Sequence, residues 1–83
     1  MRLDKYLKVS RLVKRRTVAK EMCAAGRVSV NYRPAKPGSE VKAGDIITIT
    51  RGDRILEVEV LSTPESISTA GARETYKILS GTK

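Results

Sequence analysis

Histidine, tryptophan and phenylalanine are absent from this 83-residue chain, and cysteine occurs once. Without histidine there is no imidazole for acid–base catalysis or for metal binding, and a single cysteine builds neither an internal disulfide nor a zinc site. Cys23 has no evident base beside it and falls on the apolar side of a predicted helix, so we expect it to be buried and unreactive. The composition therefore argues against an enzyme, and we expect no metal and no cofactor.

Long apolar runs are also missing, since none approaches the roughly 20 residues that cross a bilayer. The first residues are basic but lack the apolar core of a signal peptide. No glycine-rich nucleotide-binding loop is present, because Gly38, Gly44 and Gly52 stand singly in predicted turns. With one unpaired cysteine, the chain is expected to be a soluble protein of the reducing cytoplasm, without a membrane partner.

Positive charge is abundant, and it is concentrated at one end. The formal net charge is +8, and the first twenty residues hold eight basic residues and one acidic residue, Asp4, whereas the remainder holds nine basic and eight acidic residues. The eight basic residues are Arg2, Lys5, Lys8, Arg11, Lys14, Arg15, Arg16 and Lys20. This asymmetry indicates a polyanionic partner, with RNA the first candidate and DNA or an acidic membrane the alternatives.

Two short helices are predicted in this basic segment. Apolar spacing predicts the first over residues 3–11, with Asp4 in its first turn suited to pair with Lys8. The second is predicted to begin with Thr17 as its N-cap and to end at Ala25, followed by Gly26 in the left-handed conformation. Its predicted apolar side consists of Val18, Ala19, Met22, Cys23 and Ala25.

Lys14, Arg15 and Arg16 directly precede the second predicted helix. Positive charge at a helix N-terminus is unfavourable by roughly 0.3–1 kcal/mol per charge. The arrangement suits a phosphate that docks on free backbone N–H groups with arginines around it. A solvated basic loop is the alternative explanation, but the cluster continues the basic face of the first helix, which favours phosphate binding.

Alternating apolar residues predict strands after Gly26. These cover residues 27–31, a short return strand at Ala35 and Lys36, residues 46–50 and 55–61, and a last strand at 75–79 with Tyr76 and Ile78 on one face. Residues 62–73 are rich in Ser, Thr, Gly and Ala and are predicted to form a mobile loop. The fold class is therefore α+β: one domain over residues 1–83 with a core motif over 1–61, in which two N-terminal helices pack on a small, mostly antiparallel sheet.

Two other motifs have alternative explanations. Arg51-Gly52-Asp53 spells an adhesion triplet, but a hairpin turn explains it better in a chain without a secretion signal. Tyr32 could stack on an unpaired base or be a plain turn tyrosine.

Several short motifs occur together in the first fifty residues. They are Arg2-Leu-Asp-Lys5, Ser10-Arg11, Arg16-Thr17, Gly26-Arg-Val-Ser-Val-Asn31, Lys36, and Val41 with Gly44-Asp45. In combination they resemble the S4-type RNA-binding domain, also called the αL motif, and among its free-standing members the RqcP family and the related 15-kilodalton heat-shock family. The chain departs from the usual pattern of this domain in two places. Asn31-Tyr32 stands where Asn-Gly is usual, and Lys36-Pro-Gly-Ser39 is one residue longer than the usual Lys-x-Ser.

The resemblance implies a non-enzymatic, ribosome-associated factor of bacterial quality control. Such a factor binds rRNA of the large ribosomal subunit and peptidyl-tRNA, and it stabilises the tRNA while RqcH adds alanine to the stalled chain. A monomer is expected. The RNA contacts would come from the eight basic residues named above together with Thr17, with Tyr32 and Lys36 as further candidates. The alternatives are a module that delivers a separate RNA-modifying enzyme, or a small DNA-binding regulator, although the predicted second helix exposes Lys20, Glu21 and Ala24 rather than base-reading side chains.

Overall fold

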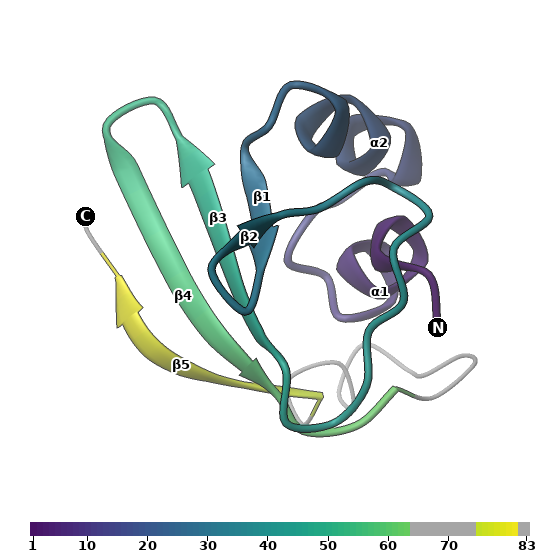
Figure 1. Ribbon diagram of the computed structural model, residues 1–83, viewed down its shortest axis with the longest axis vertical. Coiled ribbons are helices and arrows are strands. Elements are labelled where there is room, and N and C mark those ends of the chain that lie inside the picture. The colour runs from purple at the N-terminus through teal and green to yellow at the C-terminus, as the bar shows by residue number, and fades with distance from the viewer. Residues whose placement is uncertain (64–74, 82–83) are drawn as a thin grey trace.

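Two helices, α1 (Leu3–Val9) and α2 (Arg16–Ala24), lie on one side of a five-stranded sheet (Figure 1). The computed structural model describes residues 1–63 and 75–81. The strands are β1 (Val28–Val30), β2 (Arg33–Pro34), β3 (Ile46–Arg51), β4 (Arg54–Val60) and β5 (Tyr76–Gly81). They lie in the order β2-β1-β3-β4-β5, and all four neighbouring pairs among them are antiparallel. This confirms the predicted α+β fold class.

Helix α1 buries three side chains at helical spacing, Leu3, Tyr6 and Leu7, each with no exposed surface. It ends at Val9, two residues earlier than predicted. The physical reason lies at Arg11, whose φ of +63° is left-handed and stops the helical hydrogen-bond pattern. The chain then turns, and Val13 enters the core.

Helix α2 begins at Arg16, so the prediction that Thr17 is its N-cap is wrong. Arg15 occupies the N-cap in an extended conformation without a side-chain hydrogen bond, and Thr17 lies exposed in the first turn. The predicted apolar side is correct for Ala19, Met22 and Cys23, whereas Val18 and Ala25 are exposed. Gly26 follows the helix with φ +76°, as predicted, and the Arg27 amide donates to the carbonyl of Met22.

A two-residue turn, Asn31-Tyr32, joins β1 to β2, and both residues have positive φ, +53° and +66°. The Asn31 side chain holds this turn: its Nδ2 donates to Asp45 Oδ1 at 3.3 Å, and its Oδ1 accepts from the Ile46 amide at 3.0 Å. Because the turn has only two residues, the chain pairs with β1 directly after it, and Val30 lies opposite Arg33. The return strand is therefore Arg33–Pro34, and the prediction of Ala35 and Lys36 is wrong.

The β3–β4 hairpin also has a two-residue turn, in which Gly52 takes a φ of +61° and Arg51 pairs with Arg54. This confirms a hairpin turn at the Arg51-Gly52-Asp53 triplet. Strand β5 runs antiparallel to β4 with a register shift at Glu57 and Val58, and it extends two residues beyond its predicted end. Of the predicted loop at 62–73, residues 64–73 lie outside the described residues.

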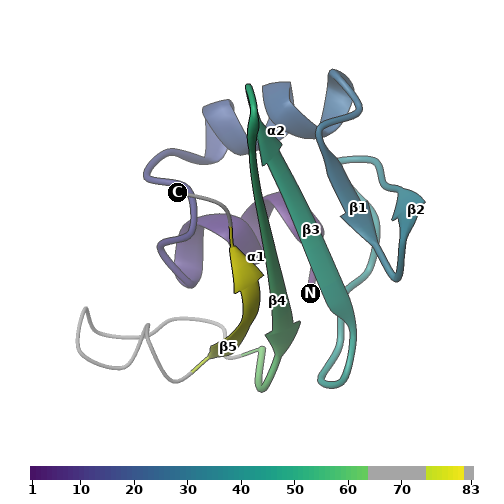
Figure 2. The ribbon, with the colours of Figure 1, turned by 90° about the vertical axis from the view of Figure 1, so that its left-hand side faces the viewer.

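The core lies between the two helices and one face of the sheet (Figure 2). Its buried apolar side chains are Leu3, Tyr6, Leu7, Val13, Ala19, Met22, Cys23, Val28, Ala35, Val41, Ile47, Ile49, Val58 and Val60. The Tyr6 hydroxyl donates to the Thr75 carbonyl at 2.6 Å, which ties α1 to the residue before β5. Burial raises the pKa of Tyr6 to about 12. Within residues 1–63 and 75–81, no helix is long and apolar enough to cross a membrane.

Candidate nucleic-acid interface

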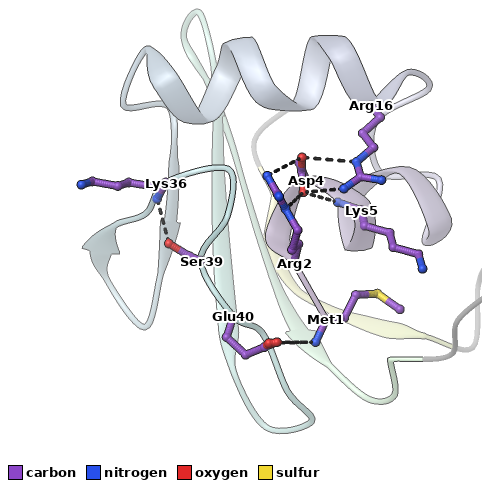
Figure 3. A network of polar contacts seen from close by, with 8 residues as sticks. All are labelled: Met1, Arg2, Asp4, Lys5, Arg16, Lys36, Ser39 and Glu40. Atoms are coloured by element: carbon purple, nitrogen blue, oxygen red, sulfur yellow. Dashed lines mark hydrogen bonds and ion pairs between the residues drawn. The ribbon is translucent and has the colours of Figure 1, made fainter.

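The start of α1 carries a carboxylate with no exposed surface, Asp4. Arg2 reaches it with Nε at 3.2 Å from Oδ1, and Arg16 reaches it with Nε at 3.2 Å from Oδ2. A second nitrogen of each guanidinium lies at 3.5 Å and 3.4 Å, respectively, and the Lys5 amide donates to Oδ1 at 2.8 Å. Figure 3 shows Asp4 between the two guanidinium groups, and we call Arg2, Asp4 and Arg16 the Asp4 cluster.

This environment keeps Asp4 ionised. Burial alone would raise its pKa, but hydrogen bonds from Arg16 and the Lys5 amide and the charges of Arg16 and Arg2 outweigh that effect. The pKa therefore lies below the ordinary value of 3.8. The cluster carries a net charge of +1, and both arginines remain partly exposed, with 55% and 43% of their side-chain surfaces accessible. A buried anion thus orients two accessible cations.

The segment before β3 holds the beginning of α1 in place. The Leu3 amide donates to the Ser39 carbonyl at 2.8 Å, and the Asp4 amide donates to the Pro37 carbonyl at 3.1 Å. The Met1 ammonium group forms an ion pair with Glu40 at 2.8 Å (Figure 3). Two amides of the first turn are therefore bonded within the chain, so exposed arginine side chains, rather than these N–H groups, are the groups that α1 offers to an anion.

The remaining predicted basic residues lie around the inter-helix turn and along the helices. Those with exposed side chains are Lys8, Arg11, Lys14, Arg15 and Lys20, whereas Lys5 is half-buried. At the N-terminus of α2 the side chain of the N-cap residue, Arg15, makes no capping hydrogen bond, and this extended residue brings its own charge to the positive end of the dipole. The predicted basic residues of the helices and the inter-helix turn thus keep exposed or half-buried side chains.

Tyr32 and Lys36 occupy separate places. Tyr32 lies in the β1–β2 turn with 67% of its surface exposed, and its hydroxyl donates to Glu57 Oε1 at 3.0 Å, a bond that raises the pKa of the phenol. Figure 3 shows the Lys36 side chain directed away from the Asp4 cluster, while its amide donates to Ser39 Oγ at 2.9 Å. Neither residue joins the cluster.

Sequence reasoning missed the part played by Asp4, for which a pair with Lys8 was predicted. The available signal was that Asp4 is the one acidic residue among eight basic ones, next to the buried Leu3. It also missed Arg51, whose Nη2 donates to the Leu12 carbonyl at 3.2 Å in the inter-helix turn. Cys23 is buried as predicted, and burial raises the pKa of its thiol.

Comparison with known proteins adds independent information. Residues 1–47 match the model of the S4 domain. The chain is 52% identical over 79 residues to an RQC P-site tRNA stabilizing factor of Listeria innocua, a match that covers 95% of this chain and 86% of the relative. A relative of the same name from Bacillus subtilis is 47% identical over 79 residues, covering 95% and 92% of the two chains.

Solved structures show the same fold. A trimeric structure of heat shock protein 15 from Vibrio cholerae superposes with a TM-score of 0.86 at 29% identity, covering 94% of this chain and 80% of the other. The solution structure of hypothetical protein HP1423 gives a TM-score of 0.82 at 34% identity, covering 96% and 98%. The similarity therefore extends over nearly the whole chain.

Proposed function

Because the chain belongs to the S4 domain family, in the group of the RQC P-site tRNA stabilizing factors, we propose that it is a non-enzymatic factor that binds RNA of the large ribosomal subunit. The observation that carries the proposal is the Asp4 cluster. There, a buried carboxylate fixes the orientation of Arg2 and Arg16 while leaving part of each guanidinium accessible. Oriented guanidinium groups bind phosphate oxygens well because their planar N–H groups match the oxygens in pairs.

Other exposed basic residues of the helices and the inter-helix turn supply further phosphate contacts. Arg11 and Lys14 lie in the inter-helix turn, Arg15 occupies the N-cap position of α2, and Lys8 and Lys20 lie exposed on the two helices. Lys5 and Thr17 complete the proposed surface. With several such contacts, affinity for RNA should fall strongly as the salt concentration rises.

We propose further that the chain stabilises tRNA on the ribosome, the role that the name of its relatives describes. The chain would hold peptidyl-tRNA on the large subunit while RqcH adds alanine to the stalled nascent chain, acting in the cytoplasm as a monomer. Two features support a role without catalysis. The sequence has no histidine, and the Cys23 thiol is buried, which raises its pKa. Light scattering on the purified protein measures its mass in solution and so tests whether it is a monomer. The question matters because heat shock protein 15 of Vibrio cholerae was solved as a trimer.

Co-sedimentation with purified large ribosomal subunits at moderate salt tests the function. The wild type should pellet with the subunits, and Arg16→Ala should remain largely in the supernatant. Lys42→Gln is the matched control, because it loses the same charge at an exposed residue before β3, outside both helices and the inter-helix turn. Equal pelleting of wild type and Arg16→Ala would show that the site is assigned wrongly.

A nuclease experiment separates RNA from DNA. Complexes isolated from cells should release the protein on treatment with RNase and retain it on treatment with DNase. Release by DNase alone would replace the ribosomal proposal with a DNA-binding regulator.

A further inference from the structure

The hairpin between β3 and β4 carries two arginines directly opposite one another, Arg51 and Arg54. Like charges in opposite positions of an antiparallel pair repel and destabilise the pairing. Asp53 is the one acidic residue in the turn between them, and within residues 1–63 and 75–81 no ion pair joins it to either arginine. The hairpin end therefore has an excess of positive charge that its own fold does not neutralise.

This hairpin contacts the inter-helix turn. The Arg51 guanidinium donates from Nη2 to the exposed Leu12 carbonyl at 3.2 Å, across 39 positions of sequence. Leu12 follows Arg11, which has a left-handed backbone, and it lies two positions before Lys14. Figures 1 and 2 show the hairpin end at the same end of the molecule as α2. Arg51 of the hairpin thus contacts the backbone of the inter-helix turn, the segment that also carries Arg11 and Lys14.

Arg11 supports the same interpretation. A non-glycine residue with φ near +60° costs of order 1–3 kcal/mol and persists where the surroundings or a function require it. The turn that this conformation makes brings Val13 into the core, while the Arg11 side chain itself stays exposed. The strained backbone places a cationic side chain in the turn that Arg51 contacts.

We propose that the β3–β4 hairpin is a second RNA-contacting arm, in which Arg51 and Arg54 bind a backbone phosphate of the same RNA that the Asp4 cluster binds. The inference rests on the proposed RNA-binding function and extends its surface from the helices to the sheet. A phosphate near the hairpin end neutralises the repulsion between the two arginines. Arg51 also remains bonded to Leu12, so the arm is held against the inter-helix turn rather than free to swing.

The test is a salt titration of binding to purified large subunits with single variants of the full chain. Arg54→Gln should lower affinity severalfold and reduce the slope of log affinity against log salt by about one, the value for one lost phosphate contact. Lys42→Gln removes the same charge before the start of β3, at the other end of that strand from the hairpin, and should leave the slope unchanged. Arg54 is exposed and its replacement removes the repulsion from Arg51, so the melting temperature of Arg54→Gln should equal or exceed that of the wild type, and weaker binding would not come from unfolding.

Further variants separate RNA binding from loop anchoring. Arg51→Lys keeps the charge but loses the planar guanidinium fork, and Arg51→Gln loses both, so the salt slope should fall only for Arg51→Gln. If Arg51 only anchored the turn, the two variants would weaken binding equally without a change in slope, and Arg54→Gln would bind like the wild type. That result would overturn the proposal.

Three more outcomes would also contradict the arm. Wild-type affinity and slope for Arg54→Gln, alongside weak binding by Arg16→Ala, would reject the arm while leaving the proposed function intact. A loss seen with intact subunits but not with deproteinised rRNA would assign the hairpin to a protein partner instead. Failure of the wild type to bind subunits at all would reject both proposals.

Discussion

Arg16 and Asp4 are twelve positions apart in sequence, yet Arg16 donates from Nε to Oδ2 of the buried Asp4 carboxylate at 3.2 Å. The contact joins the first residue of α2 to the first turn of α1. Since Arg2 bonds to the same carboxylate, Asp4 determines how two accessible cations are oriented. The surface is therefore organised by its one buried negative charge.

Replacing Asp4 by Asn should change the affinity for RNA in the direction opposite to that expected from net charge alone. The variant gains one positive charge, which by itself should strengthen binding to RNA. Because the amide cannot accept from both arginines as the carboxylate does, we expect affinity for large subunits to fall about tenfold and the free energy of unfolding to fall by about 1–3 kcal/mol. Filter binding and urea denaturation measure these two quantities.

Asp53→Asn is the control, because it adds the same charge at an exposed turn residue. Its affinity should equal or exceed that of the wild type. If both variants bound RNA more tightly than the wild type, net charge rather than orientation would govern the interface.

Arg16→Lys tests the geometry of the guanidinium while keeping its charge. A lysine ammonium does not form the two parallel bonds of the arginine fork, so we expect affinity for large subunits to fall about tenfold and stability by about 1–2 kcal/mol. Arg15→Lys makes the same change one residue earlier, where no carboxylate partner is found in the described part of the chain, and should bind almost like the wild type. Equal losses at the two positions would contradict a special role for Arg16.

Low pH should lower the free energy of unfolding, because it protonates Asp4. Its pKa in the folded protein lies below 3.8, so the unfolded chain takes up a proton at a higher pH than the native chain does. The stabilisation by the ionised carboxylate is complete above about pH 4 and is lost as the pH falls through the lower, native pKa. Urea denaturation between pH 7 and 3 should therefore show the stabilities of wild type and Asp4→Asn converging in acid. A constant difference at every pH would argue against an ionised Asp4.

The turn residue Tyr32 should be replaceable by glycine with a gain in stability. Its φ of +66° costs a non-glycine residue roughly 1–2 kcal/mol, and the hydroxyl bond to Glu57 that Tyr32→Gly would lose is exposed. We expect a net gain of about 1 kcal/mol, or about 4–8 °C in melting temperature for a domain of this size. Arg33→Gly introduces glycine at the next residue, which does not have a positive φ, and should lower the melting temperature. A lower melting temperature for Tyr32→Gly would contradict strain in the turn.

The same variant decides between the two explanations of Tyr32. A stacked base contributes about 1–3 kcal/mol to binding, so loss of a stacking tyrosine should weaken binding to large subunits at least fivefold. Unchanged affinity would identify Tyr32 as a plain turn residue.

Local patterns in the sequence predicted what depends on near neighbours. The spacing of Leu3, Tyr6 and Leu7 identified the core face of α1, and Gly26 marked the end of α2 because only glycine adopts a left-handed backbone at little cost. Alternation placed Val58 and Val60 in the core. These features required no knowledge of distant residues.

The errors arose where a distant contact outweighed the local preference. Asp4 is buried with Arg16 of the next helix as a partner, whereas helical spacing alone paired it with Lys8. The register of β2 depends on Asn31, whose bonds to Asp45 and Ile46 close the turn after two residues. Hydrophobicity placed Val18 in the core, but the turn of α2 that begins at Arg16 leaves it 40% exposed.

The bond from the Tyr6 hydroxyl to the Thr75 carbonyl spans 69 positions and has a consequence for synthesis. While the chain emerges from the ribosome, the residues of α1 appear first, but a packing partner of that helix appears only after most of the chain has been made. Long-range contacts of this kind slow folding because the intervening chain must be ordered before they form. Helix α1 would therefore gain this contact only after the residues around Thr75 have left the ribosome.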